Sequence, residues 1–316
     1  MHRVFIDGQA GTTGLEIAGR LEGRRDLRLL VIDDVLRKDT LRRAALLNEA
    51  DVVILCLPDA AAREAVALIE NPRTRVLDAS TAHRVAPGWT YGLPELAAGQ
   101  RAAIAASARV SNPGCYATGF ILSVRPLIEA GLLAPSKRVT AFAVSGYSGG
   151  GRTMIERYRA AQAQGVDHVL PPMTYGLDFA HKHVPEMTRQ AKCDCAPLFS
   201  PIVAHYYKGM LVHVPFDAVD LGGAAAEDVH ETLRVRYADE PCIRVLPFGA
   251  KEALDGGYLD PTRANDTNRI DLMVFGDAER TLVATRYDNL GKGAAGAAVQ
   301  NLNLMLGVPE LTGLCV

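Results

Sequence analysis

Hydrophobic residues in the first third of the chain form short continuous runs, separated by stretches in which apolar positions recur at helical spacing. The runs cover residues 3–7, 27–32, 51–57 and 75–78, and the helical patterns between them cover 15–21, 41–48 and 58–70. Continuous apolar strands that alternate with helices are typical of a parallel sheet covered on both faces. We therefore predict a doubly wound α/β domain with right-handed crossovers.

After residue 130 the pattern changes to alternating apolar and polar positions with few helices. Strands are predicted at 138–145, 199–206, 210–215, 243–246, 269–275 and 281–287, with a helix at 226–237. Short turns between neighbouring strands indicate antiparallel pairing, so we predict a separate α+β domain with a mainly antiparallel sheet. A final helix at 291–306 is expected to return to the first domain. The predicted division is 1–115, 116–288 and 289–316.

Three glycines follow the first strand directly, in Gly8-Gln-Ala-Gly11-Thr12-Thr13-Gly14. Their spacing differs by one residue from the usual dinucleotide fingerprint, G-x-G-x-x-G. Glycine lets the backbone approach a pyrophosphate, which the free N–H groups of a helix start can bind, and the two threonines can add hydroxyl donors. A plain glycine turn is the alternative. Because the triplet follows the first strand of a βαβ unit, we predict a nucleotide-binding site.

The residues after the second strand carry opposite charges. Asp33 and Asp34 end that strand, and Arg37 and Lys38 follow. An acidic residue here normally binds the ribose 2′-hydroxyl of NAD, whereas basic residues accept the extra phosphate of NADP. If the acids cap the next helix, the two basic side chains are free to hold the 2′-phosphate. The sequence slightly favours NADP(H) as the cofactor.

A cysteine lies at the predicted start of a helix. An apolar strand at 108–110 leads into Asn112-Pro-Gly-Cys115, and a helical pattern then continues to Glu129. The positive end of a helix dipole lowers the pKa of a thiol and favours the thiolate. A thiolate is a nucleophile suited to covalent catalysis at a carbonyl carbon. The alternative is a small buried residue that packs a turn.

Two histidines occur between the halves, in His181-Lys-His183-Val-Pro-Glu186. Residues at i and i+2 of an extended segment point to the same face. Imidazole titrates near neutral pH, so a pair beside a thiolate could supply general acid/base chemistry. The alternative is one surface histidine and one structural histidine.

Composition narrows the choice of partners. The chain has 316 residues, of which 48% are hydrophobic, so it is long and apolar enough for two domains with well-filled cores. Its net charge of -2 argues against nucleic acid or an anionic membrane as the main partner. The sequence starts directly as a strand, so no signal peptide is expected, and no apolar run reaches membrane-spanning length. Six cysteines without framework spacing indicate reduced thiols in the cytoplasm. Cys193-Asp-Cys195 has no second ligand pair at zinc spacing, so we predict no metal site.

Five motifs in order resemble the N-acetyl-gamma-glutamyl-phosphate reductase family in its shorter type 2 form. They are Asp7-Gly-Gln-Ala-Gly-Thr-Thr-Gly14, Asn112-Pro-Gly-Cys-Tyr-Ala-Thr118, Ser145-Gly-Tyr-Ser-Gly-Gly-Gly151, His181-Lys-His-Val-Pro-Glu186 and Asp288-Asn-Leu-Gly-Lys-Gly293. The similarity runs from the first strand to the last helix. Ala117 departs from the proline that the family often has there. The wider group, which includes aspartate-semialdehyde and glyceraldehyde-3-phosphate dehydrogenases, pairs a Rossmann domain with an antiparallel-sheet domain that usually mediates oligomerisation.

The resemblance implies a phosphorylating semialdehyde dehydrogenase that acts as a homodimer or homotetramer. It would use NADPH to reduce N-acetyl-L-glutamyl 5-phosphate to the 5-semialdehyde, releasing phosphate, in arginine biosynthesis. Cys115 would form a thioester, and either histidine of the pair would be the acid/base.

Four further residues are predicted to bind the substrate: Arg84, Asn112, Ser145 and Arg152. A guanidinium fork of either arginine would suit the phosphate, although an exposed structural arginine is an equal alternative for each. Two other functions stay open at this point. One is a sister enzyme for aspartyl or aminoadipyl phosphate, and the other is a nucleotide-sensing protein without catalysis.

Overall fold

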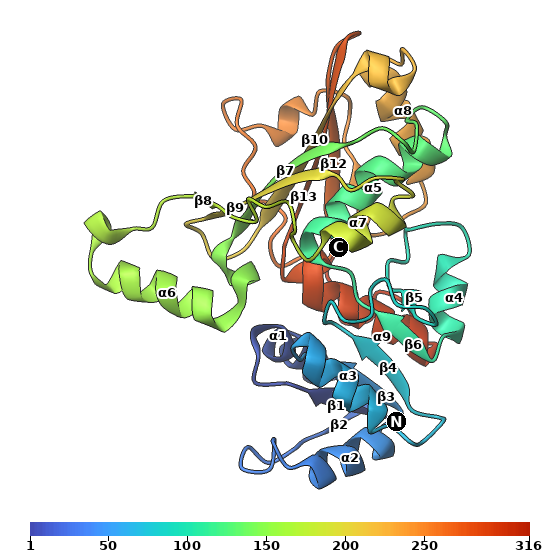
Figure 1. Cartoon of the computed structure of the whole chain (residues 1–316), viewed down its shortest axis with the longest axis vertical. Coiled ribbons are helices and arrows are strands. Elements are labelled where there is room, and N and C mark those ends of the chain that lie inside the picture. Colours follow the sequence, from blue (N-terminus) through green and yellow to red (C-terminus); the bar gives the residue numbers. More distant parts are fainter. The chain divides into compact units, whose positions relative to one another are not determined.

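The computed structural model describes residues 1–316, apart from the side chain of residue 167. The chain divides into two compact units (Figure 1). Unit 1 contains residues 1–114 and 294–314, and unit 2 contains residues 115–293 and 315–316. The chain therefore leaves unit 1 immediately before Cys115 and returns to it at Ala294.

Unit 1 is built on a parallel sheet of six strands in the order β2-β1-β3-β4-β6-β5. The strands are β1 His2–Asp7, β2 Leu27–Leu30, β3 Val52–Leu55, β4 Arg75–Asp78, β5 Thr90–Tyr91 and β6 Arg109–Ser111. All four residues of β3 are buried, as expected for a strand with helices on both sides. The predicted doubly wound parallel sheet is confirmed.

Helices cover both faces of this sheet. On one face lie α1 Thr12–Leu21, α4 Gln100–Ala106 and α9 Gly296–Leu306, and on the other lie α2 Thr40–Glu49 and α3 Asp59–Ala67. Alternate residues of β1 serve the two cores: Val4 and Ile6 pack with the first group, and Phe5 packs with the second. Each crossover thus buries the apolar stripe of its helix against the sheet.

Unit 2 is built on a seven-stranded sheet in the order β11-β12-β13-β10-β7-β9-β8. The strands are β7 Thr140–Gly146, β8 Met173–Thr174, β9 Leu198–Ala204, β10 Met210–Asp217, β11 Ile243–Val245, β12 Ile270–Gly276 and β13 Arg280–Tyr287. Among the described strand pairs of this second sheet, only β11–β12 and β7–β9 are parallel. The prediction of a mainly antiparallel sheet is confirmed.

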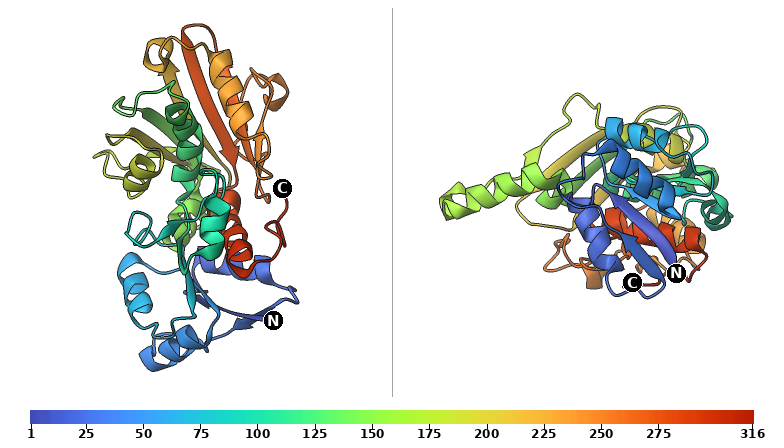
Figure 2. Two further views of the ribbon diagram at one scale, coloured as in Figure 1. Left: turned by 90° about the vertical axis from the view of Figure 1, so that its right-hand side faces the viewer. Right: turned by 90° about the horizontal axis from the view of Figure 1, so that it is seen from below.

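One face of the second sheet carries α5 Cys115–Glu129 and α8 Ala226–Arg236, and α7 Val184–Gln190 packs on α5. The helix α6 Gly151–Ala163 extends away from this sheet (Figure 2). A single π-helical turn, Gly291–Ala295, precedes α9 where a continuous helix was predicted.

The prediction of an extended segment around the two histidines is wrong. His183 is the N-cap of α7, with a proline in the first turn and Glu186 just behind it. Proline is pre-organised for the first helical turn, and an acidic residue there is favourable for the helix dipole. These two residues explain why a helix forms at this point instead of a strand.

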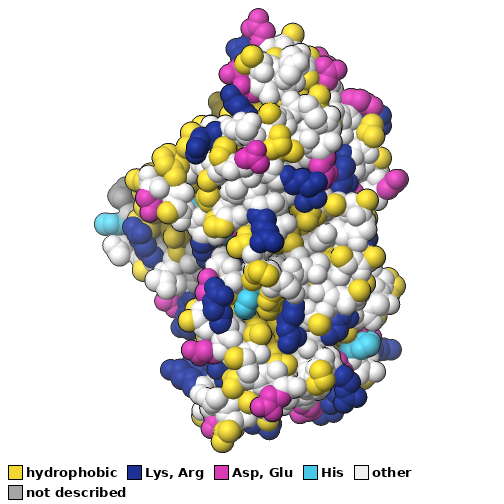
Figure 3. Space-filling view, turned by 45° about the vertical axis from the view of Figure 1, so that its right-hand side comes forward, with side chains coloured by type: hydrophobic (Ala, Val, Ile, Leu, Met, Phe, Trp, Pro, Cys, Tyr) yellow, Lys and Arg dark blue, Asp and Glu magenta, His cyan; other side chains and the backbone are white. Residues whose placement is uncertain are grey.

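Charged side chains on the face shown in Figure 3 are scattered, with basic, acidic and apolar residues interspersed. No helix in the described part of the chain is both long enough and apolar enough to cross a membrane.

Candidate active site

The glycine loop of unit 1 leaves no room for side chains at two positions. Gly8 has a φ of +90°, and a Cβ there would lie 2.3 Å from the carbonyl oxygen of Cys56. A Cβ on Gly14 would lie 2.5 Å from the carbonyl oxygen of Gly8. Gly11 is the N-cap of α1 and supplies no side-chain cap to the amides of Thr12 and the next turn. An uncapped helix start behind a tight glycine turn fits the pyrophosphate of a dinucleotide.

The basic residues predicted to bind the 2′-phosphate are exposed. Arg37 and Lys38 lie in a turn after β2. Asp33 accepts a hydrogen bond from the amide of Val35 within this turn. The cap of α2 is a different acid, Asp39, whose side chain accepts from the amide of Arg42. The condition considered for the two acids, that they cap this helix, does not hold for Asp33, which caps the preceding turn instead.

A guanidinium that sequence reasoning missed lies at the end of β1. Arg43 Nη2 on α2 is 2.7 Å from Asp7 Oδ2, and both side chains are largely buried. The ion pair links the strand that precedes the glycine loop to the helix after the Arg37–Lys38 turn. In the sequence, the indication of this ion pair was Asp7, the acidic residue directly before Gly8.

The end of β4 holds a buried hydrogen-bonded cluster around Asp78. One of its carboxylate oxygens lies 2.8 Å from Ser80 Oγ and 2.6 Å from His83 Nδ1. The His83 ring stacks on Trp89 with ring centroids 4.0 Å apart. This cluster orders the loop that leads to Arg84.

Arg84 and Asn112 brace the backbone just before Cys115. Arg84 is 8% exposed, and its Nε donates to the carbonyl oxygen of Asn112 at 3.0 Å. The Asn112 amide donates to the carbonyl of Ala294 and accepts from Asn301, each at 3.0 Å. Arg84 is therefore not the exposed arginine of the alternative view. These contacts give both residues a role in holding the Pro-Gly turn.

Cys115 is the first residue of α5. Tyr287 Oη donates to the Cys115 carbonyl oxygen at 2.6 Å and accepts from the Gly119 amide at 3.0 Å, so one phenol bridges the first turn of the helix. Glycines allow this close packing: a Cβ on Gly119 would lie 2.4 Å from Thr285 Oγ1, and one on Gly293 would lie 3.1 Å from Cys115 Cβ. The start of α5, which carries the nucleophile candidate, thus packs closely against the end of β13 and the segment that follows it.

Aromatic side chains join the cysteine to the two histidines. The Tyr116 ring lies 5.6 Å from the His181 ring and 5.9 Å from the His183 ring, and the two imidazoles are 4.7 Å apart. Tyr175 Oη donates to Tyr116 Oη at 3.2 Å. The structure therefore brings the predicted histidines into one cluster with the residue next to Cys115.

The phenols near Cys115 are held in the protonated form. Burial is the largest cause that raises the pKa of Tyr116, Tyr175 and Tyr287, and the charge of Cys115 is a further cause for all three. A hydrogen bond with Ser145 partly opposes the rise in the pKa of Tyr116, so Ser145 is also part of this cluster. Tyr175 and Tyr287 were missed by sequence reasoning, and only Tyr287 had a signal, as the neighbour of the Asp288 motif.

Arg152 takes no part in these contacts. It lies in the first turn of α6, its side chain is 79% exposed, and its Nε pairs with Glu156 Oε1 at 2.7 Å.

Two other cysteines, Cys56 and Cys193, do not lie at the start of a helix. Burial raises the pKa of Cys56 to about 12 and that of Cys193 to about 11, so both stay protonated at neutral pH.

Comparison with known proteins places the chain among dehydrogenases. The profile described as semialdehyde dehydrogenase, NAD binding domain, matches residues 14–105, and the semialdehyde dehydrogenase dimerisation domain matches residues 115–289. N-acetyl-gamma-glutamyl-phosphate reductase 2 of Nostoc sp. is 49% identical, covering 99% of each chain. The N-acetyl-gamma-glutamyl-phosphate reductase of Burkholderia lata is 48% identical, covering 98% of this chain and 97% of the relative.

Solved structures show the same fold. Aspartate semialdehyde dehydrogenase II of Vibrio cholerae, in complex with ASA, has a TM-score of 0.73 at 15% identity, covering 97% of this chain and 98% of that one. Aspartate semialdehyde dehydrogenase of Candida albicans, with NADP, has a TM-score of 0.68 at 12% identity, covering 97% and 99%.

Proposed function

The chain belongs to the N-acetyl-gamma-glutamyl-phosphate reductase family, and we propose that it reduces N-acetyl-L-glutamyl 5-phosphate to the 5-semialdehyde in arginine biosynthesis. The proposed reaction uses NADPH and releases phosphate. The observation that carries it is Cys115 at the start of α5, directly before Tyr116, whose ring lies against His181 and His183. A sensor of nucleotides would need neither a nucleophile nor an acid/base.

Cys115 is the proposed nucleophile. Its thiolate attacks the acyl carbon of the acyl phosphate, the carbon–oxygen bond to the phosphate breaks, and a thioester remains on the enzyme. The amides at the start of α5, from Tyr116 onward, are the proposed donors to the oxyanion that develops on the carbonyl oxygen. The Tyr287 bridge supports this role, because it holds the backbone of the first turn in place.

The cofactor is proposed to bind to unit 1. Bound NADPH supplies the hydride that reduces the thioester. Gly8, Gly11 and Gly14 would admit the pyrophosphate, with Thr12 and Thr13 as additional donors. For the choice of NADP(H), the support is the exposure of Arg37 and Lys38 after β2, where they can reach a 2′-phosphate.

We assign the acid/base role to His181. The His183 amide donates to His181 Nδ1 at 3.1 Å, so the neutral His181 ring carries its proton on Nε2. That Nε2–H group can act as the acid by donating a hydrogen bond to the thiohemiacetal oxygen, on which reduction of the thioester leaves a negative charge. Collapse of this oxyanion to the aldehyde breaks the carbon–sulfur bond and restores the Cys115 thiolate. His183 is 5% exposed and occupies the N-cap position of α7, so we assign it the structural role.

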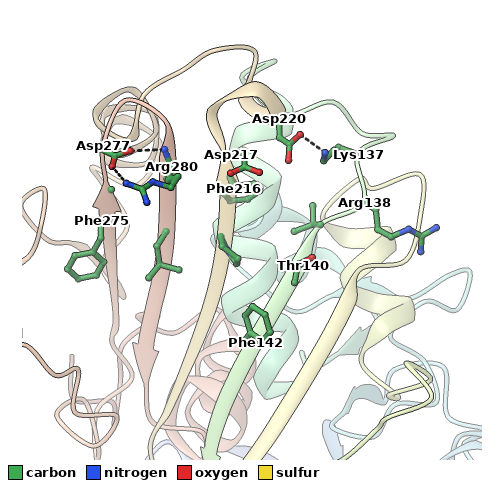
Figure 4. Close-up of a pocket in the computed structure, with 15 residues that line it drawn as sticks. Lys137, Arg138, Thr140, Phe142, Phe216, Asp217, Asp220, Phe275, Asp277 and Arg280 are labelled. Atoms are coloured by element: carbon green, nitrogen blue, oxygen red, sulfur yellow. Dashed lines mark hydrogen bonds and ion pairs between the residues drawn. The ribbon is translucent and has the colours of Figure 1, made fainter.

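We propose a homodimer, or a tetramer built from it, that forms through the open face of the unit 2 sheet. Residues of β7 alternate: Ala141 and Ala143 are buried against the helices, whereas Phe142 is 47% exposed on the other face. Figure 4 shows Phe142 and Phe275 on this face, beneath a rim of charged side chains. The match of this unit to a dimerisation domain supports the assignment.

The proposed location is the cytoplasm. All six cysteines are free thiols, and free thiols persist in a reducing compartment.

The reverse reaction tests the proposed function. Purified protein is mixed with N-acetylglutamate 5-semialdehyde, phosphate and NADP or NAD, and the absorbance of the reduced cofactor is followed. We expect phosphate-dependent reduction of NADP that is lost by ~10⁴-fold or more in Cys115→Ala. Faster turnover of aspartate semialdehyde or aminoadipate semialdehyde would move the assignment to a sister enzyme. NADPH binding without activity on any of these aldehydes would favour the nucleotide sensor.

A further inference from the structure

A cavity of about 490 Å³ lies in unit 2 where β11, β12 and β13 meet the loop that follows β11. Four arginines and one lysine line it, against two carboxylates, which leaves an excess of three positive charges. None of these residues belongs to the cluster around Cys115. A cavity with so unequal a charge needs a physical explanation.

The register of the sheet creates the charge excess. Arg244, Asp271 and Arg286 stand opposite one another on β11, β12 and β13. Arg244 Nη2 lies 2.9 Å from Asp271 Oδ1, and Arg286 Nη2 lies 2.8 Å from Asp271 Oδ2. Arg269 Nε is also 3.0 Å from Asp271 Oδ1. Three guanidinium groups therefore share one fully buried carboxylate, and two of the three positive charges are not neutralised by it.

The arginines differ in how many of their donors are already used. Arg286 is almost fully buried and is saturated, since its Nη1 also faces the carbonyls of Ala253 and Asp260 at 3.4 Å. Within the described part of the chain, both Nη groups of Arg269 and the ammonium of Lys251 have no hydrogen-bond partner. Lys251 is exposed and Arg269 is only partly buried, so an anion from solution can reach these donors. The repulsion among the unneutralised positive charges in one cavity favours a bound anion.

The rest of the lining determines what kind of anion fits. Leu246, Pro247 and Phe248 form an apolar wall beside the cationic groups. Carbon atoms of a ligand can bury surface against such a wall, which an inorganic anion cannot do. Arginine forks match the planar geometry of carboxylates.

We propose that this cavity is a binding site for a small organic polycarboxylate with at least two ionised carboxylates. One carboxylate binds between Arg244 and Arg269, and another binds to Lys251 and Arg263. The carbon skeleton packs on the apolar wall. Binding at this site is separate from the reaction at Cys115, so its test does not depend on the proposed function.

The test is isothermal titration of the full-length protein with citrate, with pyrophosphate as an inorganic anion and acetate as a single carboxylate, all at constant ionic strength. We expect one citrate per chain, with a Kd at least about tenfold lower than that of pyrophosphate. The variant Lys251→Gln should raise the citrate Kd by about tenfold, because one charged hydrogen bond is lost while the Asp271 network stays intact. The double variant Arg244→Gln/Arg269→Gln should raise it by about a hundredfold.

The matched control is Arg234→Gln on α8, because Arg234 is half-exposed, pairs with Glu231 and does not line the cavity. It should leave citrate binding unchanged, and circular dichroism should show that each variant is folded. Wild-type protein that binds no citrate would overturn the proposal. Equal affinity of wild type and Lys251→Gln, or equal affinity for citrate and pyrophosphate, would also overturn it.

Discussion

The phenol of Tyr287 offers a direct test of how Cys115 is positioned. Tyr287→Phe removes one oxygen atom that donates to the Cys115 carbonyl at 2.6 Å and accepts from the Gly119 amide at 3.0 Å. The ring is fully buried, so water does not simply replace the lost hydroxyl. The variant therefore perturbs the first turn of α5 without changing the thiol or the histidines.

The size of the effect follows from the two hydrogen bonds. If the carbonyl and the amide stay apart, two buried polar groups lose their partner, at a cost of about 1–3 kcal/mol each. If they close on each other as an ordinary i to i+4 helical bond, most of that stability returns, but the backbone of Cys115 moves toward Gly119. A displacement of about 1 Å at a reacting group costs about 100-fold in rate. We therefore expect kcat/KM to fall by about 10- to 100-fold through the backbone shift of the second case, whereas the first case alone would lower only the melting temperature.

The assay is kcat/KM in the reverse reaction, together with the melting temperature and the dissociation constant for NADPH. The NADPH constant should stay unchanged, because Tyr287 belongs to unit 2 and the glycine loop to unit 1. The control is Tyr158→Phe, since the buried Oη of Tyr158 has no hydrogen-bond partner among the described residues. A Tyr287→Phe enzyme with kcat/KM within twofold of wild type would refute the positioning role.

Three further predictions concern other parts of the protein. His181→Asn should lower kcat by about 10²- to 10⁴-fold and remove one limb of the pH–rate profile. His183→Asn should mainly lower the melting temperature. Equal pH profiles of His181→Asn and wild type would contradict the assignment. Arg37→Ser/Lys38→Ser should raise KM for NADPH by about tenfold or more and leave KM for NADH unchanged, which steady-state kinetics with both cofactors will decide. Phe142→Glu places a charge on the proposed interface and should give monomers in light scattering, and a variant that stays dimeric would exclude this face.

Most of the architecture could be predicted because its signals are local. The buried run Val52–Leu55 indicates a strand covered on both faces, and the alternation in Thr140–Gly146 indicates a strand with one open face. By contrast, α6 escaped prediction because only Ile155 and Tyr158 are buried along it, which leaves no continuous apolar stripe. The two-residue strands β5 and β8 are too short to show any periodicity.

The chemistry of the site divides in the same way. The sequence alone determined that a cysteine starts a helix and that glycines follow the first strand, since a turn and a helix start depend on residues a few positions apart. Only the tertiary structure decided which side chains surround that cysteine. Tyr175 and Tyr287 come from segments far along the chain, and they reach Tyr116 and Cys115 through the order and register of the strands. Such contacts depend on how the whole chain folds, and no local pattern encodes them.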